Sequence, residues 1–387
     1  MKLKSNIWKL LILRTASTRL YKMILAVYFL TLPGVTIPQV GLYAAVGYLT
    51  VFLLEIPTGY LSDRLGHKKM LVLSRISALL GVICFIVGSS LTWFILGSFL
   101  TSIGFATQSG TYVAFLKETL ESLNSKDKLV KTFSQIATKS YLISAGLLVV
   151  ASALTLVHIT LPLYLNLFID MLAVIIAFSL KEPRVHIEQT SHIPVQKVLC
   201  ELKQTPFLHW ALFSSLTFAF QITLSNYIYP HLTALGSPIV LLGLIVTLSR
   251  IVSAAVAQKL SHVEKIKDPY KLARIDIMLM PLLYILMSLS SNYVLVMILL
   301  IFVNGYTRGR QTFISSYLVH NYLPNSKYAA TSLSVKSQIT MFINLVVAFS
   351  IGFIMSISYQ IGIFTMGIGL FVCMLLVYFN GIKKAYK

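Results

Sequence analysis

The sequence consists almost end to end of apolar stretches, each about as long as a helix that crosses a lipid bilayer. Such a helix needs roughly 20 consecutive, mainly apolar residues. Only 11% of the residues are charged, whereas a soluble domain normally carries about 25%. The stretches are too long and continuous for barrel strands, and backbone polar groups must be satisfied inside lipid. The pattern therefore predicts an all-α integral membrane protein that crosses the bilayer many times.

We predict twelve transmembrane helices in two six-helix bundles. Their approximate bounds are 7–32, 37–60, 69–88, 93–118, 130–156, 160–180, 206–229, 238–259, 271–289, 293–318, 328–355 and 360–382. The longest polar segment, 182–204, lies between the sixth and seventh spans. We therefore expect an N-terminal bundle at 1–181, a cytosolic linker at 182–204 and a C-terminal bundle at 205–387. The working site is expected where the bundles meet, as in transporters built from repeated halves.

Lysine and arginine are concentrated in one set of loops. They occur at both termini and in the loops after even-numbered spans, and this set includes Arg308 and Arg310. The opposite loops, among them "PGVTIP", "YPHLTALGSP" and "LSSNY", contain neither residue. By the positive-inside rule, this asymmetry places both termini in the cytosol. Topology thus explains most of the net charge of +20, and we expect a lipid bilayer rather than nucleic acid around the chain.

The chain lacks the sequence motifs of common cofactor and metal sites. Cys84, Cys200 and Cys373 have no paired spacing, which favours free thiols over a disulfide or metal site. The sequence contains no Walker loop, G-x-G-x-x-G or H-E-x-x-H motif. We therefore expect no enzyme activity, no catalytic residue, no cofactor and no metal. The expected partners are a small-molecule substrate and protons as coupling ion, and the expected state is a monomer.

One charged, glycine-containing stretch interrupts the apolar pattern: "EIPTGYLSDRLGHKKML", residues 55–71. Glu55, Gly59 and Asp63 are spaced by four and so share one helix face. Gly59 is small enough for a neighbouring helix to come close, and Gly66 permits a sharp turn. The basic residues that follow suit pairing with acids or lipid phosphates: Arg64, Lys68 and Lys69. We predict a latch between helices that is broken and remade.

This loop closely resembles the signature loop between helices two and three of the major facilitator superfamily. The matching residues are Gly59, Leu61, Asp63, Arg64, Gly66, Lys68 and Lys69. The upstream "EIPTG" looks like the form common in bacterial members, and "SGTYVAFLKETL" (109–120) is similar to the end of helix four in that group. The resemblance implies a secondary active transporter of the bacterial cytoplasmic membrane that works by alternating access.

The resemblance also assigns roles within the loop. It implies that Asp63 locks to the N-terminal end of helix eleven, near residues 328–331, when the cytosolic side is closed. It further implies that a basic loop residue pairs with Glu118 or Glu121. Drug–proton antiporters of the family usually carry an arginine in helix four and a G-P-x-x-G-G run in helix five. This sequence has neither element, which weakens the assignment to drug antiport.

Four spans carry polar side chains at helical spacing, and each set occupies one face. The resemblance implies that helices one, four, seven and ten line a central cavity. We predict that the following residues line it: Arg14, Thr18, Lys22, Gln108, Tyr112, Gln221, Asn304, Arg308 and Gln311. Lys22 lies about halfway along the first span, where no acid occurs. It either attracts an anionic substrate or pairs with Glu55 on the neighbouring helix.

Charged residues inside a span point to a transport pathway or an internal pair. Glu55 and Asp170 are the predicted proton carriers, with a structural partnership as the alternative for Asp170. We expect Arg75 and Asp276 to lie within a turn or two of the cytosol and to reach water. The predicted function is proton-coupled efflux of a small molecule. The alternatives are uptake or exchange of an anionic metabolite, or a non-transporting receptor or scaffold with the same fold.

Overall fold

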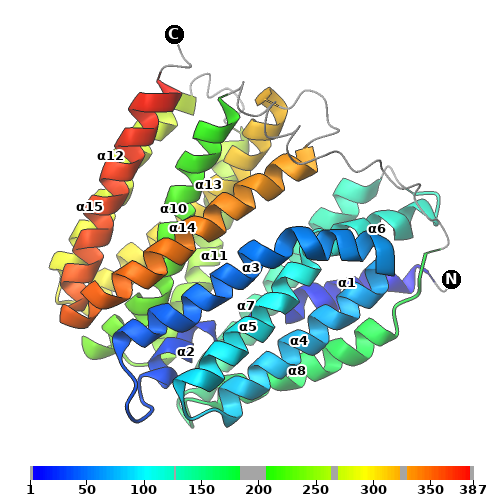
Figure 1. Cartoon of the computed structure of the whole chain (residues 1–387), viewed down its shortest axis with the longest axis horizontal. Coiled ribbons are helices and arrows are strands. Elements are labelled where there is room, and N and C mark those ends of the chain that lie inside the picture. The colour runs from blue at the N-terminus through cyan, green and yellow to red at the C-terminus, as the bar shows by residue number, and fades with distance from the viewer. Residues whose placement is uncertain (1–2, 126–127, 184–205, 263–268, 323–328, 384–387) are drawn as a thin grey trace. The chain divides into compact units, whose positions relative to one another are not determined.

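The protein is helical throughout the part of the chain that the structure describes. The computed structural model describes residues 3–125, 128–183, 206–262, 269–322 and 329–383 (Figure 1). Its first half contains α1 (Ser5–Ala16), α2 (Lys22–Phe29), α3 (Ile37–Leu65), α4 (His67–Val87), α5 (Leu91–Gln108), α6 (Thr111–Glu121), α7 (Leu129–Leu154) and α8 (Leu161–Phe178). Its second half contains α10 (Phe207–Ala234), α11 (Val240–His262), α12 (Pro269–Leu289), α13 (Tyr293–Tyr322), α14 (Ala329–Ile357), α15 (Tyr359–Val377) and the π-helix η3 (Tyr378–Ile382). No strand occurs in these ranges, and the predicted all-α fold is confirmed.

Ten helical segments of the described chain are long and apolar enough to cross a membrane. One of them, Leu91–Glu121, comprises both α5 and α6. Two predicted spans are not among the ten. The span at 7–32 is divided into α1 and α2, and the span at 293–318 corresponds to α13, a helix of 30 residues. The chain is a multi-pass membrane protein, and the total of twelve spans stays a prediction.

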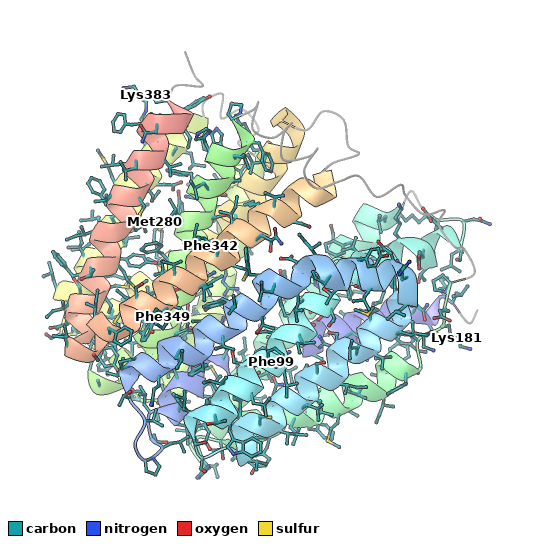
Figure 2. The ribbon with its side chains drawn as sticks, viewed as in Figure 1. Phe99, Lys181, Met280, Phe342, Phe349 and Lys383 are labelled. Carbon is teal, nitrogen blue, oxygen red and sulfur yellow. The ribbon has the colours of Figure 1, made fainter. Side chains whose placement is uncertain are left out.

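Large apolar side chains cover much of the helix surface. Phe99 on α5 and Phe342 and Phe349 on α14 are all exposed (Figure 2). Water would penalise so many exposed aromatic and aliphatic groups, because soluble proteins rarely display contiguous apolar surface on this scale. Lipid tails do not penalise them. The exposed side chains therefore fit the apolar composition of the spans.

The helices form two compact units. One unit comprises Met1–Val35 and Val46–His192, and the other comprises Thr36–Ala45 and Ile193–Lys387. The predicted linker at 182–204 falls mostly outside the described residues, which omit 184–205. The predicted bundle boundaries therefore stay a prediction.

In the first unit, the chain returns to the end from which it started. The Asn6 side chain donates a hydrogen bond to the carbonyl of Lys181 (2.8 Å) and accepts one from the Lys181 N–H (3.1 Å). Lys9 Nζ donates to the carbonyl of Ser179 (2.5 Å). The start of α1 is thus joined to the end of α8. Because these two ends lie together, the chain between them must run along the unit an even number of times.

In the second unit, too, the last helical segment lies against the start of the first helix. A Cβ on Gly381 would overlap the ring of His209, so η3 lies against the start of α10. Arg274 Nε, near the start of α12, donates to the Tyr378 hydroxyl (2.8 Å). The helices between Phe207 and Ile382 therefore also return the chain to the end where the unit begins.

Two of the predicted continuous spans are interrupted. The first span breaks between Ala16 and Lys22, where the N–H of Leu20 donates to the Asn166 side chain instead of to a helical carbonyl (3.1 Å). The fourth span breaks at Ser109–Gly110, because Gly110 has a φ of +71°. Glycine adopts that left-handed conformation without the penalty that a Cβ brings. Both interruptions are departures from the sequence-based expectation.

Close packing of α4 on α5 depends on three glycines. A Cβ on Gly81 would stand 2.5 Å from Thr101 Cγ2 and 2.8 Å from the carbonyl oxygen of Gly97. A Cβ on Gly104 would stand 2.8 Å from the carbonyl oxygen of Ser74. That close approach lets the Ser74 hydroxyl donate to the Gly104 carbonyl at 2.6 Å. Small residues at helix interfaces allow such contact inside membranes.

We expect Gly81→Ala to separate α4 from α5 and to lower the free energy of unfolding by about 1–3 kcal/mol, as overpacking typically does. The measurement is thermal unfolding of the full chain in detergent. Gly146→Ala is the matched control, because no atom of the described residues lies within 4 Å of a Cβ at that position in α7. Equal melting temperatures for both variants would contradict the assigned packing.

Candidate functional site

The α3–α4 connection turns at Gly66, which has a φ of +93°. This conformation favours glycine, and it lets α4 start at His67 with only Gly66 between it and the end of α3 at Leu65. No atom of the described residues lies within 4 Å of a Cβ built on Gly59, and the role of this glycine in the latch stays a prediction.

A chain of hydrogen bonds joins this turn to α6. Thr111 donates to the Ser62 hydroxyl (2.9 Å), and Ser62 lies 2.7 Å from His67 Nδ1. Because Ser62 accepts from Thr111, its own proton is available to Nδ1. The Nε2–H of His67 then faces Glu118, 3.3 Å away. Glu118 thus meets a basic loop residue, and that residue is His67, which the sequence reasoning left out of the latch.

The remaining charged residues of the loop point outward. Asp63, Arg64 and Lys69 are exposed, and the Arg64 guanidinium lies 5.0 Å from the ring of Tyr60. The predicted partner region of Asp63 begins at residue 328, which lies outside the described residues. The latch role of Asp63, Arg64, Lys68 and Lys69 therefore stays a prediction.

The first unit buries a carboxylate that two arginines share. Asp170 on α8 has no exposed surface. Its Oδ2 accepts hydrogen bonds from Asn166 (2.7 Å) and from Arg19 (3.2 Å), and its Oδ1 lies 4.0 Å from Nη1 of Arg75. We call Arg19, Arg75, Asn166 and Asp170 the Asp170 cluster. Since Asn166 also accepts from the Leu20 N–H, the cluster ties the break between α1 and α2 to α4 and α8.

Gln108 connects the same cluster to the second break. Its side-chain oxygen accepts from Arg75 Nη2 and from the Ser17 hydroxyl (2.9 Å), and its Nε2 lies 2.8 Å from Ser17 Oγ. Ser17 belongs to the α1–α2 break, and Gln108 is the last residue of α5. The two interrupted helices therefore meet at their interruptions, through one serine and one glutamine.

The second unit buries a comparable group, which we call the Asp276 cluster: Thr217, Asp276, Tyr306, Arg310 and Lys336. Arg310 pairs with Asp276 and also donates to Thr217 (2.8 Å), while the Tyr306 hydroxyl donates to Asp276 (2.6 Å). Lys336 on α14 is buried and close enough to Arg310 for the two cations to repel each other. Four helices thus contribute to one cluster around a single carboxylate, and Tyr306 and Arg310 share α13.

Three charged residues lie deeper than predicted. Arg75 is 2% exposed, Asp276 is 0% exposed and Arg310 is 1% exposed. From the sequence, Arg75 and Asp276 were expected within reach of cytosolic water, and Arg310 was expected in a cytosolic loop. Each instead pairs with a residue of opposite charge from another part of its unit, and this pairing offsets part of the free-energy cost of burying the charge. Asp170 and Asp276 are each the single acid of an apolar span, and such a lone acid was the signal that the sequence offered for a buried partner.

Some predicted cavity residues bond to each other within one unit. Gln221 on α10 donates to Asn304 on α13 (2.6 Å) and to Ser225 (3.2 Å), and both Gln221 and Asn304 are buried. Tyr112 is buried in the apolar core of the first unit, where its hydroxyl donates to the Leu10 carbonyl (3.0 Å). These positions differ from the predicted cavity lining.

The other predicted cavity residues are at least partly exposed. Lys22 and Arg308 are exposed, and Gln311 is half-buried. Thr18 is half-buried and shares a hydrogen bond with Ser144 on α7 (3.0 Å). The Arg14 guanidinium lies between 4.8 and 5.9 Å from three aromatic ring centres: Tyr112, Phe133 and Tyr141. Their contact with a substrate stays a prediction.

We expect Asp276→Asn to lower the free energy of unfolding by about 3–5 kcal/mol, because it leaves buried cations without their anion. The double variant Asp276→Asn with Arg310→Gln should recover part of that loss. The measurement is thermal unfolding in detergent. Arg308→Gln, two residues from Arg310 but exposed, is the matched control. An additive loss in the double variant would show that the pair is not coupled.

Comparison with known families and structures extends over nearly the whole chain. Residues 8–335 match the family model described as Major Facilitator Superfamily. This confirms the resemblance inferred from the loop, while the "EIPTG" subtype stays a prediction. No curated protein sequence matches the chain.

Three solved transporters have similar structures. A mutant of the nucleoside transporter NupG has a TM-score of 0.78 at 13% identity, over 97% of this chain and 99% of that one. A bacterial homologue of the human lysosomal transporter Spinster, inward-facing and occupied, has a TM-score of 0.71 at 13% identity, over 99% and 97%. A mutant of the peptide transporter POT has a TM-score of 0.74 at 11% identity, over 98% and 94%. At these identities the likeness shows a shared fold.

Proposed function

Because the chain belongs to the Major Facilitator Superfamily, we propose that it is a secondary active transporter that exports a small molecule by alternating access, driven by protons. The family and the similar structures indicate a transporter rather than an enzyme. Export, proton coupling and the location in a bacterial cytoplasmic membrane are the parts we propose. The loop lysines and arginines support cytosolic termini.

The observation that carries the proposal is the presence of ionised groups deep among apolar helices. Asp170 and Asp276 are completely buried, each beside basic side chains from other helices. Charges inside a membrane are costly, so they mark transport pathways or the internal pairs that move during transport. A passive scaffold would gain nothing from two such clusters.

We assign proton coupling to Glu55. It is half-buried and accepts a hydrogen bond from Ser109 at the break between α5 and α6 (3.2 Å). Asp170 is less suited to the task. Its protonation would leave Arg19 and Arg75 without their shared anion, and that loss would disturb the whole cluster.

The coupling assignment predicts that Glu55→Gln abolishes the response of transport to an imposed pH gradient, because an amide carries no exchangeable carboxyl proton. Downhill flux should persist. The measurement is flux in proteoliposomes with a substrate found by screening, with and without the gradient. Glu121→Gln, another half-buried acid at the end of α6, is the control. If Glu55→Gln and Asp170→Asn both keep the wild-type response, neither acid carries the proton.

The latch predicted from the loop gives a second test. Asp63→Asn or Gly59→Leu should reduce flux about 10–100-fold, since a latch contact of about 1.5–3 kcal/mol shifts a two-state equilibrium by that factor. Membrane insertion should remain normal. His158→Gln, in the exposed turn between α7 and α8, is the control. Near-normal flux in both correctly inserted latch variants would refute the latch.

A second candidate function is uptake or exchange of an anionic metabolite. The buried charges of the first unit favour it, because Arg19 and Arg75 share one acid, Asp170. A surplus of buried positive charge attracts an anion. The same flux assay separates the candidates by the direction of movement and by the charge of the accepted substrate.

A further inference from the structure

Two helix ends with partial positive charge follow Ser17 and Gln108 closely along the chain. α2 starts at Lys22 and α6 at Thr111, and neither N-cap residue, Tyr21 or Gly110, supplies a capping side chain. The first turns of both helices contain no acidic residue. The N-terminus of a helix carries about half a positive charge. In transporters, the ends of interrupted helices commonly face anionic groups.

The charged side chains of the Asp170 cluster are not balanced. Arg19 and Arg75 share the single carboxylate of Asp170, so the Asp170 cluster carries one surplus positive charge. No other acid takes part in the hydrogen bonds and ion pairs described for these two arginines. Glu55 also lies at the break between α5 and α6, where it accepts a hydrogen bond from Ser109. The surplus charge of the Asp170 cluster and the two helix ends have the same sign, so a ligand that binds to these arginines is an anion.

One buried nitrogen marks where the anion would bind. Arg75 is 2% exposed, and its Nη1 donates no hydrogen bond to any described residue. Its Nη2 is directed to Gln108, which places the guanidinium at the contact between the two breaks. The nearest acid oxygen, Asp170 Oδ1, is 4.0 Å away and accepts no hydrogen bond from the described residues either. An arginine so placed has a donor left for a further acceptor.

We propose that Arg75, Gln108 and Ser17 form a binding site, within the first unit, for one carboxylate group of a small organic anion. A carboxylate matches the planar guanidinium, and its single charge equals the surplus. The Gln108 amide directs one N–H to Ser17, which orients it, and carries a second N–H as a further donor. The site rests on the second candidate function, transport of an anionic metabolite, and names the part of the molecule that recognises the substrate's charge.

The sharpest test replaces the ligand with a carboxylate attached to the protein. Gln108→Glu is nearly isosteric and puts an acid beside Arg75, whose surplus charge it neutralises. We expect this variant, without ligand, to melt about 1–2 °C above the wild type, because the shift in melting temperature for a given gain in stability falls with chain length. A lower melting temperature than the wild type would overturn the proposal, because it would mean that no anion is favoured there.

The second test measures binding on the purified full chain in detergent, by the shift in melting temperature. The probes are succinate, its neutral diamide succinamide and inorganic phosphate. We expect succinate to stabilise the wild type by about 2–4 °C at saturating concentration, and succinamide to have no effect. Gln108→Glu should abolish the response. Stabilisation by phosphate alone, or by none of the three probes, would overturn the assignment to a carboxylate.

Arg75→Gln provides a variant that should still fold. It leaves Arg19 and Asp170 as a balanced pair at 3.2 Å, so the unliganded protein should melt near the wild-type temperature. The response to succinate should be lost. Arg64→Gln, which removes an exposed arginine of the same unit, is the matched control and should keep the response. A retained response in Arg75→Gln would refute the site.

This binding experiment is independent of transport. If succinate binds through Arg75 but no flux of any anion is found, the site stands and the transport proposal fails. If anions are transported but succinate binding does not depend on Arg75 or Gln108, the transport proposal stands and the site is refuted.

Discussion

The first unit depends on one interaction, the buried carboxylate of Asp170 shared by two arginines. Through Asn166 and Arg19 it holds the break between α1 and α2, and through Arg75 and Gln108 it reaches the break between α5 and α6. The second unit pairs the buried Asp276 on α12 with Arg310 on α13 in a related way. Buried ion pairs add little net stability, because desolvation offsets their attraction. In our proposal their value lies in fixing which helices move together and in leaving positive charge for an anion.

The sequence was sufficient to predict the features that a lipid environment requires. Apolar stretches of about 20 residues have one stable form in a bilayer, so the all-α fold followed directly. The loop at residues 59–69 was informative because Gly66 must adopt a left-handed conformation, which the structure has at a φ of +93°. Polar residues at helical spacing were also informative in part. Gln108 does lie where two helices meet, and Gln221 and Asn304 lie on facing sides of α10 and α13.

What could not be predicted depends on contacts between helices distant in sequence. Arg75 is followed along its own helix by apolar residues, so nothing local distinguishes an arginine that reaches water from one that pairs with Asp170, 95 positions later. The partner of Glu118 was predicted among the lysines and arginines, but a histidine takes that place because Ser62 and Thr111 orient its ring. The breaks in the first and fourth spans were missed for a similar reason. The N–H of Leu20 is satisfied by Asn166, which only the folded unit brings near.

The second candidate function and the proposed carboxylate site share one claim, that the surplus of buried positive charge in the first unit serves to accept a transported anion. Counterflow tests it directly and requires no knowledge of direction or coupling ion. Proteoliposomes that contain the purified protein are loaded with an unlabelled small carboxylate and diluted into a trace of the labelled compound, with the corresponding amide tested in parallel. The account predicts transient accumulation of the labelled carboxylate, far above that in protein-free liposomes, and none of the amide. Equal uptake of both compounds, or no uptake of any carboxylate tested above the protein-free level, would contradict it.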